Sequence, residues 1–343
     1  TLGQRLLVRE GLGVNQLGGL VKITVGIVLV ATAIQMIGFA ALFARFSVLY
    51  PAAEAVWQAS FHAVSGFNNA GFVALREADG LMAFAGDEAV LGIIAALAVL
   101  GGLGYWVLVD VVTRRRFSLF TLTTKLVLML TATLMLVGTL AFLAFEYKNP
   151  ETLGPLPVEQ KVVTSVFESI SGRTAGFSTV SYGETAQHTN FFFTALMFIG
   201  GASASVAGGI KINTLGVVLI AVLSTLGGHA HTKAFGREIP HVQVQRATAI
   251  AVMALIVVFL FALVLTFSEP DFAFSDLLFE AVSAFGTVGL STGLTPDLSQ
   301  GGHLILIVAM FLGRIGPFTL GLMMIERGEN DLYRYAQERI TIA

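Results

Sequence analysis

The chain has 343 residues, of which 55% are hydrophobic and only 12% are charged, and its formal net charge at pH 7 is −2. Soluble domains carry about a quarter charged residues, so this composition excludes an ordinary soluble protein. The absence of cysteine excludes disulfides and thiol catalysis, and the sequence holds no basic tract that would bind nucleic acid.

Six apolar runs follow one another along the chain, and each is long enough to cross a bilayer as a helix, which takes about 20 residues. They cover residues 18–46, 87–113, 119–147, 190–222, 244–268 and 303–326. The sequence therefore predicts an all-α, multi-pass integral membrane protein in contact with the lipid bilayer.

Lysine and arginine residues concentrate in alternate connections between these runs. Thirteen of the twenty lie in one set of connections: Arg5, Arg9, Lys22, Arg114, Arg115, Arg116, Lys125, Lys233, Arg237, Arg246, Arg327, Arg334 and Arg339. Because connections rich in Lys and Arg stay on the cytoplasmic side, we expect this set to face the cytoplasm and the protein to lie in the plasma membrane.

A short glycine-ended phrase recurs three times, each time between two of the long runs. It reads SGFNNAGF at 65–72, SGRTAGF at 171–177 and SAFGTVGL at 283–290. The phrases divide the chain into tandem repeats that share one orientation, which indicates rotation about an axis along the membrane normal, whereas inverted repeats are common in secondary transporters. The predicted bounds are 1–116, 117–225 and 226–327 for the repeats and 328–343 for a polar cytoplasmic tail.

Apolar stretches of about 52–66, 158–172 and 274–285 precede the three phrases and are too short to span a membrane. Irregular backbone at membrane depth is tolerated only where protein or water covers it. We therefore expect each stretch to be a re-entrant helix, followed by an extended segment that returns along the wall of a central pore.

The glycine phrases fit a cation filter, in which backbone carbonyl oxygens replace the hydration shell of the ion. Pointing successive carbonyls at one axis needs backbone angles that glycine adopts readily, so Gly71, Gly176 and Gly289 are the predicted filter glycines. The flanking carbonyls are expected from Asn68, Asn69, Ala70, Thr174, Ala175, Thr287 and Val288. The alternative is that these glycines only allow close helix packing, which is common in membranes.

At these phrases the sequence resembles a known family. FHAVSGFNNAGF, FESISGRTAGFST and FEAVSAFGTVGLSTGLT are similar to the filter loops of the Trk/Ktr/HKT superfamily of potassium transporters, and most of all to those of its Ktr-type membrane subunit. That family has four helix–pore-loop–helix repeats around one pore. The three glycines match its second, third and fourth filter glycines, so three of four expected repeats are present. Because the chain begins with Thr rather than Met, we expect it to lack the first quarter of a longer gene product.

The resemblance implies the pore-forming membrane subunit of a potassium uptake system, through which ions pass passively. K⁺ is expected at the carbonyls of the filter residues, with Na⁺ as a second ion that activates or permeates, and neither an organic cofactor nor an enzymatic activity is implied. The implied partners are a second copy of the chain, in a homodimer, and a cytoplasmic nucleotide-binding regulatory ring of the KtrA/TrkA type (an RCK ring). The alternative function is a secondary transporter with alternating access.

The stretch GGASASVAGGIKINT at 200–214 is so rich in glycine that a regular helix throughout it is unfavourable. It lacks the GK[ST] ending of a phosphate-binding loop. The resemblance implies that residues 200–211 form an intramembrane gate loop below the filter, close to Arg314. The residues of this predicted gate are Gly200, Gly201, Ala202, Ser203, Ala204, Ser205, Val206, Ala207, Gly208, Gly209 and Lys211. The alternative is a packing kink with a snorkelling lysine.

Four charged or titratable residues fall within or beside the short apolar stretches. Glu168 and Glu280 occupy the same place in their stretches, and His62 is their counterpart in the first. The two carboxylates either attract cations at the outer mouth or hydrogen-bond nearby backbone. Arg173 directly precedes the second predicted filter segment, Thr174 to Gly176. We expect it to brace the filter from behind, because an ion in the pore would repel it.

Overall fold

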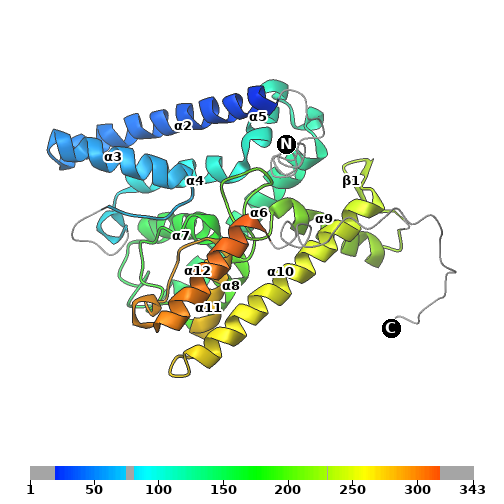
Figure 1. Ribbon diagram of the computed structural model, residues 1–343. Coiled ribbons are helices and arrows are strands. Elements are labelled where there is room, and N and C mark those ends of the chain that lie inside the picture. Colours follow the sequence, from blue (N-terminus) through cyan, green and yellow to red (C-terminus); the bar gives the residue numbers. More distant parts are fainter. Residues whose placement is uncertain (1–19, 75–80, 230, 317–343) are drawn as a thin grey trace.

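A computed structural model describes residues 20–74, 81–229 and 231–316 of the chain (Figure 1). Within these residues the protein is all-α apart from one short hairpin, as the sequence predicts. The predicted tail at 328–343 and the end of the last apolar run lie outside the described residues.

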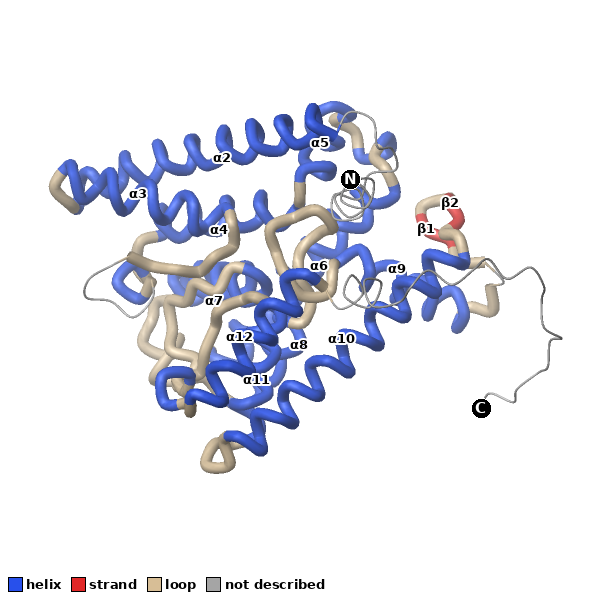
Figure 2. The backbone as a smooth tube through the Cα atoms, in the orientation of Figure 1, coloured by secondary structure: helices blue, strands red, loops and turns tan. Residues whose placement is uncertain are grey.

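One order of elements occurs three times: a long helix, a short helix, an extended glycine segment and a second helical part (Figure 2). The first repeat contains α2 (Leu20–Leu49), α3 (Ala52–Phe67), η1 (Met82–Phe84), α4 (Glu88–Leu103) and α5 (Tyr105–Arg114). The second contains η2 (Phe117–Leu119), α6 (Leu122–Glu146), α7 (Val158–Thr174), α8 (Gln187–Met197) and α9 (Ile212–Leu226). An antiparallel hairpin of β1 (Lys233–Ala234) and β2 (Arg237–Glu238) leads to the third, which contains α10 (His241–Ser268), α11 (Phe274–Gly286), η3 (Thr295–Asp297) and α12 (Gln300–Ile315).

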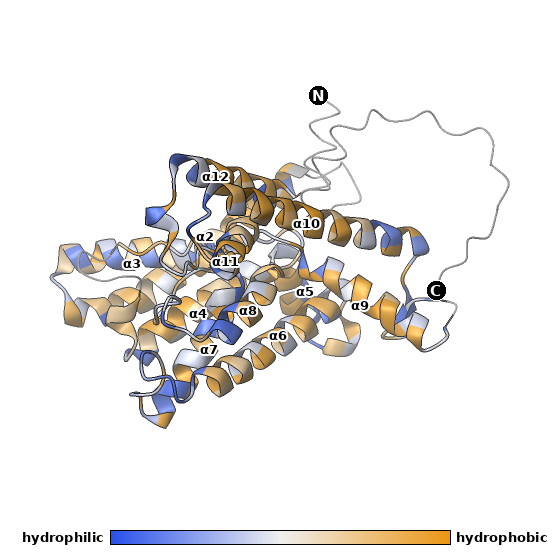
Figure 3. Cartoon of the chain, turned by 90° about the horizontal axis from the view of Figure 1, so that it is seen from below, coloured by the Kyte–Doolittle hydropathy of each residue, from blue (hydrophilic) through white to orange (hydrophobic). Residues whose placement is uncertain are grey.

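The long helices α2, α6 and α10 are strongly apolar, and Figure 3 shows the predominantly hydrophobic colour of α6 and α10. By length and composition each could cross a membrane, and α4 with α5 forms a fourth candidate as a bent pair. Large apolar side chains stay exposed on them, for example Ile37 at 71% and Phe267 at 79%. Helices that are apolar all round belong in a bilayer or a large core, so these exposed faces are suited to lipid.

The apolar run 87–113 is not one helix, contrary to the prediction. It breaks at Gly104, which has a φ of 77°, and α4 and α5 are bent by 96° relative to one another. A Cβ at this position would lie 3.1 Å from the backbone oxygen of Ser203. Glycine therefore permits both the turn and the close approach of the 200–211 loop, and the even apolar composition of the run hides this break in the sequence.

The short helices α3, α7 and α11 begin and end within two residues of the predicted stretches. Phe167 of α7 is buried in an apolar core that it shares with α3 and α4 of the first repeat. Phe279 and Phe285 of α11 are fully buried against side chains of α6 and α8 in the second repeat. Packing between repeats therefore fixes the positions from which the three glycine segments start.

Candidate functional site

Each short helix leads directly into a segment whose glycine has a positive φ. The angles are 72° at Gly71, 75° at Gly176 and 100° at Gly289. Residues with a Cβ disfavour this region, whereas glycine enters it readily. The three predicted filter glycines therefore share a backbone conformation that explains why glycine occurs in each phrase. We call residues 68–72, 174–177 and 287–290 the first, second and third glycine segments.

The three glycine segments pack against one another in chain order. A Cβ at Gly71 would lie 2.6 Å from the backbone oxygen of Ala175, and one at Gly176 would lie 1.9 Å from that of Val288. The first segment therefore touches the second, and the second touches the third, with no room for a side chain at either contact. Segments more than a hundred residues apart in sequence are thus brought to one place.

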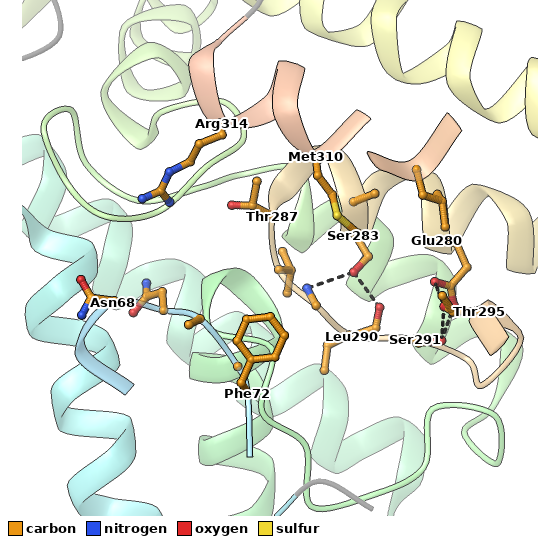
Figure 4. Close-up of a pocket in the computed structure, with 17 residues that line it drawn as sticks. Asn68, Phe72, Glu280, Ser283, Thr287, Leu290, Ser291, Thr295, Met310 and Arg314 are labelled. Carbon is orange, nitrogen blue, oxygen red and sulfur yellow. Dashed lines mark hydrogen bonds between the residues drawn. The ribbon is translucent and has the colours of Figure 1, made fainter. Parts of the chain in front are cut away.

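A cavity of about 560 Å³ separates the first glycine segment from the third (Figure 4). Asn68 and Phe72 lie on one side of it, and Thr287 and Leu290 lie on the other, while Arg314 approaches from α12. The predicted filter residues along its walls are Asn68, Asn69, Ala70, Gly71, Thr287, Val288 and Gly289. The remaining three, Thr174, Ala175 and Gly176, join the group through the packing contacts of the second segment.

A buried serine holds each glycine segment from behind. Its hydroxyl donates to the carbonyl of the residue after the predicted filter glycine, at 2.9 Å from Ser65, 2.5 Å from Ser171 and 2.6 Å from Ser283. The acceptors are Phe72, Phe177 and Leu290. Each serine is the first residue of its phrase. Its recurrence in the sequence could have indicated a shared role, but the sequence does not identify the acceptor.

The second glycine segment differs from the others by one residue, because its phrase is one residue shorter. In the first and third repeats the additional residue has a positive φ, of 50° at Asn69 and 51° at Thr287. In the second, α7 ends at Thr174 and Ala175 follows with a φ of −108°, so the left-handed residue is missing. A β-branched residue such as Thr287 is strained in this region, and strain of this kind persists where the surrounding structure holds it, often at functional sites.

Glu168 is fully buried and Glu280, which lines the cavity, is 4% exposed, and both accept several hydrogen bonds. Glu168 accepts from the backbone N–H and hydroxyl of Thr179 at 2.7 and 2.8 Å, and from Tyr182. Glu280 accepts from the backbone N–H of Thr292 at 2.9 Å and from the hydroxyl of Ser291 at 2.6 Å. Of the two alternatives left open by the sequence, the geometry therefore favours binding of nearby backbone over attraction of ions at the outer mouth.

In the first repeat, His62 and Gln58 stand behind the glycine segment in place of a glutamate. The Nδ1 atom of His62 lies 2.8 Å from the carbonyl oxygen of Gln58, one turn before it. The Gln58 amide in turn donates to the carbonyl of Ala74 at 2.9 Å. Ala74 follows its filter glycine by three residues, as Thr179 and Thr292 follow theirs. Gln58 thus binds the residue at the same place of the returning segment, but it donates to a carbonyl where the glutamates accept from backbone N–H groups.

Arg173 is 4% exposed and lies beside Gly102, where a Cβ would be 3.9 Å from its Nη2. Its Nε and Nη1 are buried without a hydrogen-bond partner among the described residues. Bracing of the second glycine segment by Arg173 stays a prediction, and these two atoms supply no hydrogen bond for it within the described residues.

The 200–211 loop interrupts the second helical part of the second repeat, between α8 and α9, as its glycine content predicts. The backbone N–H of Ala202 donates to the carbonyl of Gly102 at 2.9 Å, beside the bend between α4 and α5. On the other side, a Cβ at Gly208 would lie 2.3 Å from the Thr287 hydroxyl. The loop therefore lies between the bent helix of the first repeat and the start of the third glycine segment.

Two cationic side chains bind successive carbonyls of this loop. Arg314 donates from Nη1 to the Val206 carbonyl, and Lys211 donates from Nζ to the Ala207 carbonyl. Both cations were predicted to lie at the gate, and the geometry brings them together on one turn of the loop. Their role as gate residues remains a prediction.

Comparison with known proteins relates the chain to cation transporters. The TrkH family model, described as a cation transport protein, matches residues 1–333. The Ktr system potassium uptake protein B of Bacillus subtilis (strain 168) is 42% identical over 338 residues, which cover 97% of this chain and 74% of that protein. The potassium/sodium uptake protein NtpJ of Enterococcus hirae is 35% identical over 349 residues, covering 100% and 76%. The crystal structure of the potassium transporter TrkH from Vibrio parahaemolyticus matches with a TM-score of 0.73 at 15% identity, covering 94% of this chain and 70% of that one, and so shares its fold.

Proposed function

Because the chain belongs to the TrkH family of cation transport proteins, we propose that it is the pore-forming membrane subunit of a potassium uptake system. The observation that carries this proposal is the convergence of three glycine segments, each with a positive φ at its glycine. Segments of this kind can present backbone carbonyl oxygens in place of the hydration shell of an alkali cation. Ions move passively, driven by a membrane potential that contributes about 2.3 kcal/mol per charge and 100 mV.

The proposed filter has an open side, which is the cavity of about 560 Å³ between the first and third glycine segments. The fourth repeat implied by the family resemblance would supply the missing wall at this side. K⁺ is the proposed ion at the filter carbonyls. Na⁺ is proposed as a second ion, supported by the similarity of the chain to the potassium/sodium uptake protein of Enterococcus hirae.

The 200–211 loop is the proposed gate. Its contacts with Thr287 and with Gly102 support this role, because they place it directly beside the start of a filter segment. We expect the Lys- and Arg-rich connections to face the cytoplasm, where a nucleotide-binding regulatory ring controls the gate of a homodimeric subunit. The description of the Bacillus relative as one protein of a Ktr system supports the existence of partner subunits.

The filter proposal is tested with Gly176→Ser in the full-length protein, expressed in a potassium-auxotrophic bacterium. A side chain at Gly176 would collide with the Val288 carbonyl, so we expect the half-saturating K⁺ concentration for rubidium uptake to rise and K⁺/Na⁺ discrimination to fall, each by roughly tenfold or more, which corresponds to about 1.4 kcal/mol.

Gly92→Ala is the matched control, because a Cβ at Gly92 would meet nothing within 4 Å. This variant should transport like the wild type. If Gly176→Ser also transports like the wild type while both are present at equal levels in the membrane, Gly176 is not part of a filter, and close packing becomes the explanation for the phrases.

A further inference from the structure

Two loops that are distant in sequence meet where α6 and α10 begin. One connects α5 to α6, and the other is the β1–β2 hairpin (Figure 1). The rings of Phe117 and Phe235 meet edge to face at 6.2 Å, and the Lys125 ammonium lies 5.6 and 5.7 Å from their centres. Lys125 also donates to the Ser118 carbonyl at 3.0 Å. We call Phe117, Lys125 and Phe235 the aromatic clasp.

The backbone is strained on both sides of the aromatic clasp. Phe235 and Gly236 have φ values of 50° and 72° at the centre of the two-residue hairpin turn. Turns with positive φ at both central residues favour Asn-Gly, and a bulky phenylalanine there is an outlier. Arg115, on the other loop, has a φ of 56°.

The positive φ values of Phe235 and Arg115 are unusual among the non-glycine residues of the described chain. Its other non-glycine residues with positive φ are Asn69, Ala204 and Thr287, which all lie in the glycine segments or the 200–211 loop. Strain persists where a structure is held for a purpose. The aromatic clasp is therefore a candidate second functional location.

The surface around the clasp combines exposed apolar groups with positive charge. Phe117, Leu119 and Phe235 are 47%, 54% and 42% exposed. Exposed cations surround them, and we call these the basic rim: Arg115, Arg116, Lys233 and Arg237. In the described part of the chain, none of the four forms a salt bridge with a carboxylate. The one acidic neighbour on the hairpin, Glu238, is the cross-strand partner of Lys233 and pairs with His231 at 3.2 Å.

The patch lies where two membrane spans start. Both α6 and α10 are long and apolar enough to cross a bilayer, and they begin only a few residues after Phe117 and after the hairpin. Aromatic residues favour the headgroup level of a bilayer, and clusters of four or more Lys and Arg beside a span attract anionic lipids. This position, beside the first residues of two candidate membrane spans, favours a lipid over a protein partner.

We propose that the basic rim binds the phosphate headgroup of an anionic phospholipid, while Phe117, Leu119 and Phe235 enter the interfacial layer beside it. The strained turn holds Phe235 against Phe117, so that cations from two distant loops surround one headgroup. Lipid binding at this location would tie the entry of α6 to that of α10, and hence the second repeat to the third. The inference depends on the membrane location of the chain and not on the proposed ion filter.

The test measures bound lipid directly. The full chain is placed in nanodiscs of equal parts phosphatidylglycerol and phosphatidylcholine, and retained lipids are counted by native mass spectrometry. We expect the wild type to prefer phosphatidylglycerol, and the quadruple variant Arg115→Gln, Arg116→Gln, Lys233→Gln and Arg237→Gln to lose roughly tenfold or more of that preference. Phe235→Asn should keep the hairpin folded, because Asn suits the turn, and should lower the preference more weakly.

The single variant Arg237→Gln should lower the preference in part. Lys148→Gln is its control, since Lys148 is an exposed cation that follows the other end of α6. The proposal is wrong if the quadruple variant keeps the wild-type preference, or if Lys148→Gln lowers it as much as Arg237→Gln does. It is also overturned if inorganic phosphate displaces the lipid completely, which would indicate a site for a free anion. Retained lipid preference with lost potassium uptake would indicate a protein partner and would equally overturn it.

Discussion

The residues that shape the glycine segments are mostly not the glycines. In each segment a serine binds the carbonyl of the residue after the glycine, and Glu168, Glu280 or Gln58 binds the backbone two residues further along. Because irregular backbone at membrane depth cannot bond to water, these side chains supply the partners that a helix or sheet would otherwise provide. Any change in them should therefore alter both stability and the carbonyl positions of the segment.

Ser171→Ala tests this at the shortest of the three serine bonds. The variant leaves the buried Phe177 carbonyl without its donor, and an unsatisfied buried polar group costs about 1–3 kcal/mol. We expect a lower thermal unfolding midpoint of the purified protein and reduced K⁺/Na⁺ discrimination. Ser60→Ala is the control, because Ser60 only donates to Val56 within α3 and is more exposed. Equal midpoints for the two variants would show that the Ser171 bond does not hold the segment.

The three glycines could be identified from the sequence because each phrase has a glycine at the position where φ is positive, and glycine adopts such angles readily. It did not reveal the serine acceptors or the Gln58 bond, since these partners depend on the path of the returning segment. The shorter second phrase was visible, yet its consequence, the absence of the left-handed residue that Asn69 and Thr287 supply in the other two, required the backbone angles.

At the scale of elements, an acidic side chain ties the long helix of each repeat to the start of its second helical part. Glu146 at the end of α6 accepts from the backbone N–H of Ala186, which precedes α8, at 2.9 Å. Glu269 after α10 accepts from the backbone N–H of Ser299, which precedes α12, at 3.2 Å. The first repeat reverses the direction, because Asp87 caps α4 and accepts from Arg45 of α2 at 2.7 Å.

The Glu269 tie predicts a pH dependence of stability. The Ser299 hydroxyl, opposed by partial burial and assisted by the Ser299 N–H, holds the pKa of Glu269 below its usual value of 4.5. Since the folded pKa is the lower one, the stabilisation is complete above the unfolded pKa and is lost as pH falls through the folded pKa. We expect Glu269→Gln to lower the unfolding midpoint at pH 7 and to flatten its decline at acid pH.

The measurement is the thermal unfolding midpoint from pH 7 down to about pH 3, a window that spans the ordinary glutamate pKa. Glu151→Gln, at an exposed position after α6, is the control and should follow the wild-type curve. A Glu269→Gln curve parallel to that of the wild type would mean that the carboxylate does not titrate differently in the folded protein. The sequence alone does not reveal this bond, because the partner of Glu269 lies thirty residues away.

At the scale of the whole molecule, the 200–211 loop is the element that links the repeats. It donates a backbone hydrogen bond to the Gly102 carbonyl of the first repeat. From the third repeat, Thr287 lies against it and Arg314 donates to one of its carbonyls. The sequence predicted the loop and its two cations, whereas the bend at Gly104 that accommodates it was missed. A uniform apolar run gives no sign of where a helix will turn to admit another segment.

This arrangement predicts how the loop should respond when its contacts are removed. Arg314→Gln takes away the donor to the Val206 carbonyl, and Gly208→Ala forces a methyl group against the Thr287 hydroxyl. If the loop closes the pore, either change should displace it and raise rubidium flux in proteoliposomes several-fold. Because both act on one loop, the double variant should give less than the product of the two increases, as expected for coupled sites.

Gly92→Ala again serves as the control for an added methyl group, and equal thermal midpoints would show that the variants are folded. A double variant whose flux equals the product of the single effects would mean that Arg314 and Gly208 act on separate elements. Unchanged flux in both single variants would instead assign the loop a packing role. The coupling between the two sites, more than either increase alone, distinguishes one moving loop from two independent contacts, since only a shared element makes the second change partly redundant.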